Sequence, residues 1–293
     1  MRNPIVAYIA GAMAGFVFGC LFRFDTYLAK DRGGDSNGGG TANQRLIYVV
    51  TPTYARPQQK AELTRLSYAL RLAGNIHWVL VEDSAKPTEM VSSLVKQSGI
   101  PFTLLNVETP PEYKLRTRDP SWLKPRGVLQ RNAALHFLRE KTSPEDDSVV
   151  YFADDDNTYD VRLFEEMRLT KKASVWPVGL VGGLMVERPI VIDGRIKRFN
   201  AVFRPDRTYP IDMAAFAVSL KLLKNHPDAV FSLNVPRGHQ ETHFLTKLLS
   251  RVSELEPRAD NCTKVLVWHT RTENTDLKLE KRLAMPSNQG IEV

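Results

Sequence analysis

Residues 149–159 combine a short apolar run with three consecutive carboxylates, and this combination constrains the fold more than any other feature of the chain. The run 149–153 is β-branched and aromatic at its start, which predicts a short buried strand. Asp154, Asp155 and Asp156 follow it directly. Ligands of open α/β sheets bind at the carboxyl ends of the strands. The segment therefore predicts an α/β protein with a ligand site at the end of this strand.

The three carboxylates repel one another, so they are hard to explain as packing. A hard cation, or a ligand rich in hydroxyl groups, would neutralise them. Side chains of an extended chain alternate between faces, so Asp154 and Asp156 share one face and Asp155 takes the other. One face could bind sugar hydroxyls while the last carboxylate takes a divalent ion that bridges a diphosphate. The alternative is a solvated acidic turn, because short motifs of this kind are only hypotheses.

The N-terminal segment predicts a membrane anchor. Residues 4–22 carry no charge, and a helix of this length just spans a thin bilayer. A cleaved signal peptide is the alternative, but no clear small-x-small cleavage site follows the run. We predict a cytoplasmic tail at 1–3, a transmembrane signal anchor at 4–22 and a flexible, glycine-rich stem at 23–45.

The orientation of this anchor stays open on composition alone. Only Arg2 and the amino terminus precede the span, whereas Arg23, Lys30 and Arg32 follow it, and the positive-inside rule then puts the bulk of the chain in the cytosol. Residues 261–263, Asn-Cys-Thr, form an N-glycosylation sequon at Asn261 that matters only in the lumen.

Charge and cysteine content limit the possible partners. The net charge is +7, but lysine and arginine are scattered among acids without a basic block, so we expect no nucleic-acid binding. A few cations suffice for an anionic nucleotide sugar. Cys20 lies in the predicted span, so no disulfide can form within the soluble part. Cys262 is then either a small buried residue or an intermolecular link.

Strands and helices alternate through the first half of the chain, which predicts a mostly parallel sheet. The predicted strands are 46–50, 77–81, 102–107 and 149–153, and the predicted helices are 57–72, 88–97 and 129–139. Tyr54, Asp83 and the three aspartates should then meet at one edge of the sheet. The second half is more mixed, with a strand at 180–184 containing a close-approach glycine pair, a helix at 239–249 and a strand at 265–268.

Five further residues could carry chemistry. His269 and Arg271 lie two apart after a predicted strand, which suits a diphosphate, although both could be ordinary surface residues. Arg126 and Arg131 lie at a helix start, where positive charge opposes the helix dipole unless an acidic ligand binds. Glu241 lies in a first helical turn, where an acid usually just satisfies the dipole. We expect the dipole to keep its pKa low and leave an ionised proton acceptor.

With these residues assembled, the chain resembles the β-1,3-glucuronosyltransferases, a family of Golgi type II membrane enzymes. The resemblance runs from about residue 47 to residue 273. It is carried by ordered blocks that are far more specific than an Asp-x-Asp motif: 48–54, 59–65, 77–83, 130–132, 151–159, 174–178, 255–259, 261–263 and 268–273.

The resemblance implies a GT-A-like α/β fold, with a UDP-sugar-binding lobe at 46–157 and an acceptor-binding lobe at 158–293. It also implies UDP-glucuronate as donor, Mn²⁺ as cofactor, a homodimer, and a lumenal catalytic domain on the Golgi membrane, against the charge count. The segment after Glu273 departs from the family pattern. That segment can reach the acceptor from the partner subunit in the family, so acceptor identity and the dimer contact stay open.

The resemblance also implies a role for each candidate residue. Donor-binding roles fall on Tyr54 as a uracil-stacking ring, Asp83 and Arg126 beside it, Asp154 and Asp155 as ribose and sugar contacts, and Arg131, His269 and Arg271 as diphosphate and glucuronate contacts. Asp156 is implied as the Mn²⁺ ligand. Acceptor galactose is implied to contact Glu187, Asp212 and Glu241, with Glu241 as the catalytic base.

These roles predict an inverting transferase that moves glucuronic acid to O3 of a terminal β-galactose in one displacement. The preferred acceptor is the Gal-Gal-Xyl linkage region of proteoglycans, and N-acetyllactosamine-type glycoproteins or glycolipids are the alternative. A metal-dependent nucleotidyltransferase would also use clustered carboxylates, but neither a second metal site nor a Gly-rich triphosphate loop is visible. A catalytically inactive, membrane-anchored carbohydrate-binding protein would need neither a metal ligand at Asp156 nor a base at Glu241.

Overall fold

The computed structural model describes residues 44–115, 119–120, 123–273 and 276–291. The tail and membrane anchor predicted at 1–22, and nearly all of the predicted stem, lie outside the described residues. Within the described ranges, no helix is both long and apolar enough to span a bilayer.

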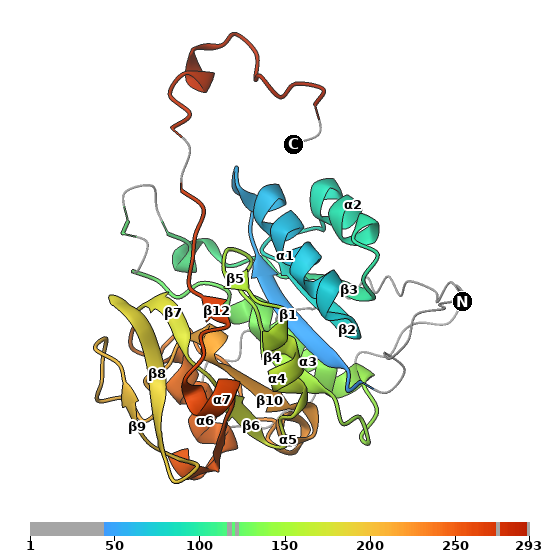
Figure 1. The fold of residues 1–293 in the computed structure, drawn as a ribbon. Helices are drawn as coiled ribbons and strands as arrows, with labels where there is room; N and C mark the ends of the chain where they lie inside the picture. Colours follow the sequence, from blue (N-terminus) through green and yellow to red (C-terminus); the bar gives the residue numbers. More distant parts are fainter. Residues whose placement is uncertain (1–43, 116–118, 121–122, 274–275, 292–293) are drawn as a thin grey trace, which may run out of the picture.

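A seven-stranded sheet forms the centre of the molecule, in the order β11-β6-β10-β4-β1-β2-β3 (Figure 1). β1, β2, β3 and β4 pair in parallel, and β10 runs antiparallel to both β4 and β6. The mostly parallel sheet predicted for the first half is therefore confirmed. The strands are β1 Ile47–Thr53, β2 Ile76–Glu82, β3 Phe102–Asn106, β4 Val149–Phe152, β6 Ala173–Val175, β10 Phe216–Ser219 and β11 Leu255–Pro257.

Three helices connect the parallel strands and cover both faces of this sheet. α1 (Gln59–Ala73) and α2 (Glu89–Gln97) pack side by side on one face, and α3 (Val128–Lys141) contacts β1, β2 and β3 (Figure 1). Leu63, Leu66 and Leu70 recur at helical spacing and are buried, which explains why α1 lies on the sheet. The helices predicted at 57–72, 88–97 and 129–139 are confirmed.

A smaller, five-stranded sheet follows the order β5-β12-β7-β8-β9. Its strands are β5 Thr158–Tyr159, β7 Val178–Val181, β8 Leu184–Ile192, β9 Arg195–Asn200 and β12 Val267–Trp268. The single strand predicted at 180–184 is wrong, because β7 ends and β8 begins on either side of Gly182 and Gly183. Both glycines have positive φ, 62° and 81°, so they form the hairpin turn instead of a strand interior.

The central sheet crosses the predicted lobe boundary between residues 157 and 158, because β6, β10 and β11 belong to the second half of the chain.

The helix predicted at 239–249 is present as α6, and Cys262 is fully buried, as one of its two interpretations requires. The remaining helices are α4 Arg162–Arg168, α5 Leu220–Asn225, α6 Gln240–Leu248, α7 Ala259–Cys262, and the 3-10 turns η1 Pro111–Tyr113, η2 Met213–Ala215, η3 Val252–Glu254 and η4 Glu280–Arg282.

An aromatic cluster joins the strand that carries the acids to helix α6. The Phe152 ring on β4 lies 5.1 Å from the Phe231 ring and 5.5 Å from the Phe244 ring, both edge-on. Phe231 and Phe244 stack at 4.6 Å. These contacts fix α6 against the end of β4, so they place a helix from the second half of the chain beside the acidic segment.

Phe152→Ala should lower the free energy of unfolding by about 3–5 kcal/mol, because it leaves a cavity among rings that cannot all collapse into it. Chemical denaturation measures this. Leu72→Ala, at a side chain that is 77% exposed, is the matched control and should change stability by less than about 0.5 kcal/mol. Equal effects of the two substitutions would contradict the central role of the cluster.

Candidate active site

The carboxyl ends of β1, β2 and β4 meet at one edge of the central sheet, with β1 in the middle. Tyr54 follows β1, Asp83 follows β2 and the three aspartates follow β4. The Asp83 amide donates to the Thr53 carbonyl at 2.8 Å, and the Thr53 hydroxyl donates to Asp155 at 2.7 Å. The structure therefore brings together the groups that the strand order predicted would meet.

Asp155 is buried, whereas its neighbours Asp154 and Asp156 are half-buried, and Asp155 and Asp156 lie in a turn after β4 instead of the predicted extended chain. Its Oδ2 accepts from the Thr53 hydroxyl, and its Oδ1 lies 2.6 Å from Nη2 of Arg56. Burial raises the pKa of Asp155, although Arg56 and Thr53 oppose this shift. Asp155 thus supports the acidic segment from within the protein, and because it is only 6% exposed it offers little surface for the sugar contact implied for it.

Asp154 pairs with the first turn of α3. Nη2 of Arg131 lies 2.5 Å from Asp154 Oδ1, and Nη1 of Arg131 donates to the Arg126 carbonyl at 3.1 Å. Gly127 precedes α3 with φ 71°, and a Cβ there would lie 2.7 Å from Nη1 of Arg131. The glycine therefore permits both the left-handed backbone and the close passage of the arginine toward the acid.

Asp156 lies among the charges of Asp154, Asp155 and Glu62. Burial, followed by the charges of Asp154 and Asp155, raises its pKa to about 6. Its carbonyl accepts from Arg65 at 2.8 Å and from the Thr270 hydroxyl at 2.9 Å, so the backbone is fixed while the carboxylate stays half-buried. Among the described residues, no group of three or more His, Cys, Asp or Glu side chains is arranged to hold a metal ion.

The two predicted nucleobase contacts, Tyr54 and Asp83, differ in how far their side chains are exposed or already hydrogen-bonded within the protein. The Tyr54 ring is 40% exposed, with the Arg56 guanidinium 4.5 Å and the Arg126 guanidinium 5.9 Å from its centre. Arg126 also donates to the Tyr54 hydroxyl at 3.3 Å. Both carboxylate oxygens of Asp83 accept bonds from Thr109 at 2.7 Å. Tyr54 therefore offers an open stacking surface, whereas Asp83 is held in place beside it.

A second group of titratable side chains lies next to the acidic segment. Nδ1 of His269 lies 3.4 Å from Asp212 Oδ2, an ion-pair distance rather than an aligned hydrogen bond. Asp212, with smaller contributions from Asp154 and Asp156, raises the pKa of His269 to about 9 against the effect of burial. Burial would raise the pKa of Asp212, but His269 and the Ala214 amide hold it below its usual value. The histidine is therefore a cation at neutral pH.

Glu241 lies in the first turn of α6, as predicted, but its protonation differs from the prediction. Burial and the nearby charge of Asp212 raise the pKa of Glu241 to about 8. The expected low pKa is wrong, because the helix dipole is a smaller effect than loss of solvent around a side chain that is only 13% exposed. Such a carboxylate is a stronger base once it is ionised.

Arg207 was missed by the sequence analysis. Its guanidinium is buried, donates to the carbonyls of Arg204, Phe203 and Gly238, and lies 3.8 Å from Glu241 Oε2. No motif or spacing singles it out, because the irregular loop that buries it takes shape only in the folded chain. Its charge offsets that of the two acids beside it, Glu241 and Glu187.

Glu187 lies on β8, facing the glycine turn. Burial raises its pKa to about 7, with Arg207 opposing and Asp212 reinforcing the shift. A Cβ on Gly182 would lie 2.6 Å from Glu187 Oε2, so the turn leaves room for this carboxylate. Among the three predicted acceptor contacts, the charge of Asp212 therefore raises the pKa of both Glu187 and Glu241.

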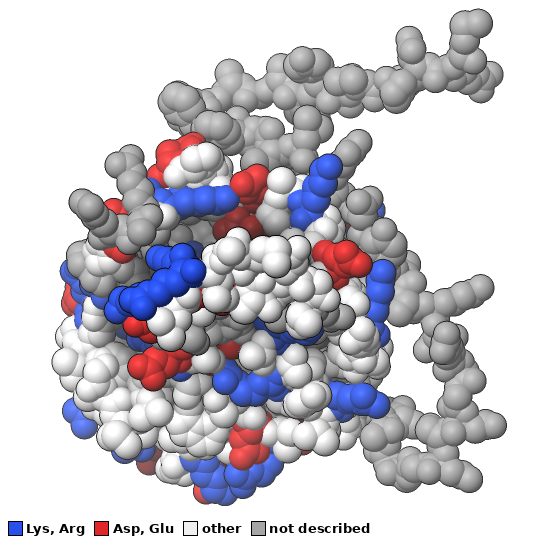
Figure 2. Space-filling model, turned by 90° about the horizontal axis from the view of Figure 1, so that it is seen from above, with Lys and Arg blue, Asp and Glu red and all other residues white. Residues whose placement is uncertain are grey.

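Arg271 and Asn261 are exposed, as Tyr54 and Arg126 are. The Arg271 side chain is exposed just after β12, two residues beyond His269. Asn261 is exposed on α7, with a left-handed φ of 52°. On the face shown in Figure 2, acidic and basic side chains are interspersed.

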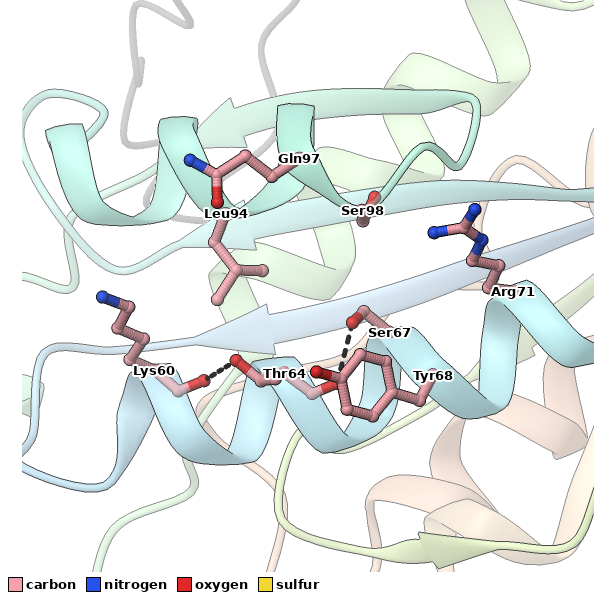
Figure 3. A pocket seen from close by; sticks show the side chains of 8 residues that line it. All are labelled: Lys60, Thr64, Ser67, Tyr68, Arg71, Leu94, Gln97 and Ser98. Atoms are coloured by element: carbon pink, nitrogen blue, oxygen red, sulfur yellow. Dashed lines mark hydrogen bonds between the residues drawn. The ribbon is translucent and has the colours of Figure 1, made fainter.

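A shallow groove between α1 and α2 is separate from these groups (Figure 3). The side chains around it come from the two helices and the turn after α2: Lys60, Thr64, Ser67, Tyr68, Arg71, Leu94, Gln97 and Ser98. None of them is a predicted site residue. The predicted site residues therefore lie outside this groove.

Comparison with known proteins identifies relatives along most of the chain. The model of glycosyltransferase family 43 matches residues 66–273. Galactosylgalactosylxylosylprotein 3-beta-glucuronosyltransferase 3 of Homo sapiens is 54% identical over 260 residues, covering 84% of this chain and 77% of that protein. Galactosylgalactosylxylosylprotein 3-beta-glucuronosyltransferase I of Drosophila melanogaster is 51% identical over 256 residues, covering 84% and 83%.

Similarity to solved structures is much weaker in sequence. TarS 1-349 of S. aureus in complex with UDP-GlcNAc is 16% identical, with a TM-score of 0.48, and the match covers 84% of this chain and 63% of that one. The mannosyltransferase PcManGT of Pyrobaculum calidifontis, in complex with GDP-Man and Mn²⁺, is 15% identical with a TM-score of 0.45, covering 86% and 69%.

His269 should stabilise the fold in a pH-dependent way. Its pKa rises from 6.5 to about 9 on folding, so its contribution is fully present below pH 6.5 and is lost as the pH rises through about 9. Denaturation of the wild type and of His269→Gln across this range measures the difference in stability, which should shrink as the pH increases. A difference that stays constant or grows would contradict a protonated His269 paired with Asp212.

Proposed function

This chain belongs to glycosyltransferase family 43, and we propose that it transfers glucuronic acid from UDP-glucuronate to O3 of a terminal β-galactose. The proposed acceptor is the Gal-Gal-Xyl linkage region of proteoglycans. Relatives more than 50% identical bear the name galactosylgalactosylxylosylprotein 3-beta-glucuronosyltransferase and align over most of their own length. The observation that carries the proposal is the ion-pair contact of His269 with Asp212, because the charge of this acid supports a cation at His269 and also raises the pKa of Glu241.

The donor half of the proposed site follows the strand ends in a GT-A-like arrangement. The exposed ring of Tyr54 suits stacking on uracil, with Arg126 close to its edge. Asp154 is an acceptor for ribose or sugar hydroxyls, oriented by Arg131. His269 and Arg271 follow β12 and would contact the diphosphate and the glucuronate, which are both anionic.

The residues present fit a divalent cation at Asp156. Its pKa is raised by burial and then by the neighbouring carboxylate charges, and a bound cation would offset both effects. A single carboxylate suits Mn²⁺ when substrate phosphates and water complete the coordination, because oxygen ligands of this kind are the ones that such ions take. We propose that Asp156 holds Mn²⁺, which when bound would neutralise the charge that develops on the leaving diphosphate.

The acceptor half of the proposed site supplies the base. Glu187 and Asp212 would accept hydrogen bonds from galactose hydroxyls, and Glu241 would take the proton from O3. That oxygen then attacks C1 of glucuronate from the face opposite UDP, the C1–O bond to the diphosphate breaks, and the configuration inverts. The protonated His269 offsets the negative charge on the leaving group.

We further propose a type II Golgi membrane protein with a lumenal catalytic domain, acting as a homodimer. The exposed position of Asn261 supports the lumenal orientation, because its side chain is accessible to the glycosylation machinery. Mapping the glycan on the protein expressed in animal cells tests this orientation.

Glucuronate transfer from UDP-glucuronate is the direct test of the function. The purified lumenal part should release UDP and extend Gal-Gal-Xyl in the presence of Mn²⁺, and lose this activity in excess EDTA. N-acetyllactosamine serves as the competing acceptor, and a higher kcat/KM for it would overturn the proposed acceptor. UDP release that is unchanged by any galactose-terminated acceptor would overturn the transferase assignment.

Glu241→Gln keeps the shape of the side chain but cannot accept the proton, so turnover should fall by roughly 10²–10⁴-fold. Initial rates measure this, and UDP affinity by calorimetry should stay near the wild-type value. In the wild type, kcat/KM should rise as the pH increases through about 8, where Glu241 ionises, and fall above about 9, where His269 loses its proton. Retention of most of the rate would place the base elsewhere, with Asp212 as the next candidate.

A further inference from the structure

A buried group of charges lies beneath the proposed donor site. Nη2 of Arg56 contacts both Glu62 Oε2 and Asp155 Oδ1, so one guanidinium bridges two carboxylates. Glu62, in the first turn of α1, is 3% exposed, and the Arg56 side chain is 12% exposed. The Thr53 hydroxyl, which donates to Asp155, also accepts from Gln59 at 3.1 Å. The polar ends of these side chains therefore already form ion pairs or hydrogen bonds with one another.

This group touches the proposed nucleobase platform. The Arg56 guanidinium lies 4.5 Å from the centre of the Tyr54 ring, and Nη1 of Arg56 donates to the Tyr54 carbonyl at 3.1 Å. The ring is thus supported on one side by a cation whose own position depends on two carboxylates. A stacked guanidinium needs a fixed plane, which two anionic partners provide.

The same group reaches the segment after β12. Glu62 Oε1 accepts from the Thr272 amide at 3.3 Å, next to Arg271, and Gln58 donates to the Glu273 carbonyl at 3.4 Å. One turn further along α1, Arg65 donates to the Asp156 carbonyl at 2.8 Å. The start of α1 therefore contacts all three parts of the proposed donor site, namely the ring, the acidic segment and the diphosphate segment.

We propose that Glu62, through Arg56, is a positioning residue that holds these three parts in register for the nucleotide. The inference rests on the proposed function only for the identity of the donor. Glu62 is 3% exposed and contacts Arg56 and the Thr272 amide, so it acts through these partners. Replacing a buried ion pair by an apolar pair often leaves stability unchanged, and the value of such a pair is then the geometry that it specifies.

Glu62→Gln is the primary test, because it keeps the side-chain shape and an acceptor for Thr272 while it removes the charge that holds Arg56. The Kd for UDP with Mn²⁺, measured by calorimetry, and the donor KM should both rise roughly tenfold, the change expected from one lost charge-assisted hydrogen bond. The acceptor KM should change less than about twofold, because the acceptor half of the site is untouched.

Matched substitutions separate positioning from general damage. Glu89→Gln removes an exposed carboxylate from the first turn of the neighbouring helix α2 and should leave UDP affinity unchanged. Arg56→Lys keeps the positive charge but cannot bridge two carboxylates and stack on a ring at once, so it should weaken UDP binding like Glu62→Gln. Thermal unfolding confirms that each variant is folded, and Arg56→Lys replaces Glu62→Gln if the latter is not.

The same substitution made in a Tyr54→Ala protein distinguishes positioning from a purely structural role of Glu62. If Glu62 acts through the ring, Glu62→Gln should weaken UDP binding much less in a Tyr54→Ala protein than in the wild type. An equal loss in both backgrounds, or a folded Glu62→Gln protein with wild-type UDP affinity, would overturn the inference. UDP binding is measured without acceptor, so these outcomes do not depend on transfer. A wild type that binds UDP but transfers no glucuronate would refute only the proposed function.

Discussion

The mutual repulsion of three carboxylates at the end of β4 is the constraint on which the rest of the site depends. The protein gives each carboxylate a different environment. Asp154 is paired with Arg131, Asp155 is buried against Arg56 and Thr53, and Asp156 keeps a pKa raised to about 6. Asp155 and Asp156 lie in a turn after β4, and this turn buries Asp155 while it leaves Asp154 and Asp156 half-buried. Two cations therefore stabilise the fold, and the remaining charge is left for a ligand.

Asp212 links the two halves of the site. Its ionised carboxylate keeps His269 protonated, and the same charge raises the pKa of Glu241. One buried acid thus favours a cation on the donor side and a strong base on the acceptor side, which are the two groups that an inverting displacement requires. Arg207 limits the shift at Glu241, because its buried guanidinium lies 3.8 Å away.

The positions of the site residues along the chain were predictable. Apolar periodicity placed β1, β2, β3 and β4 and the helices between them, and parallel pairing required their carboxyl ends to share an edge. Tyr54, Asp83 and the three aspartates follow those strands, so their proximity needed no further information. The extended backbone assumed for the division of faces among the aspartates is not present, because Asp155 and Asp156 lie in a turn; only the burial of the middle carboxylate agrees with that prediction. The sequence position alone did not assign chemical roles. The roles of Glu241 as the base and of Asp156 as the metal ligand were implied by long blocks that resemble a known family.

What the sequence by itself determined was therefore the set of elements and the edge where their polar residues collect, because both follow from local periodicity and strand order. Only the tertiary structure decided the environment of each group. Glu241 has a raised pKa because packing removes its solvent, an effect that the local helix dipole cannot reveal. Arg207, Arg56 and Glu62 became visible only when segments distant in sequence came together around them. Burial and charge coupling depend on three-dimensional neighbours, and the order of residues does not specify those distances.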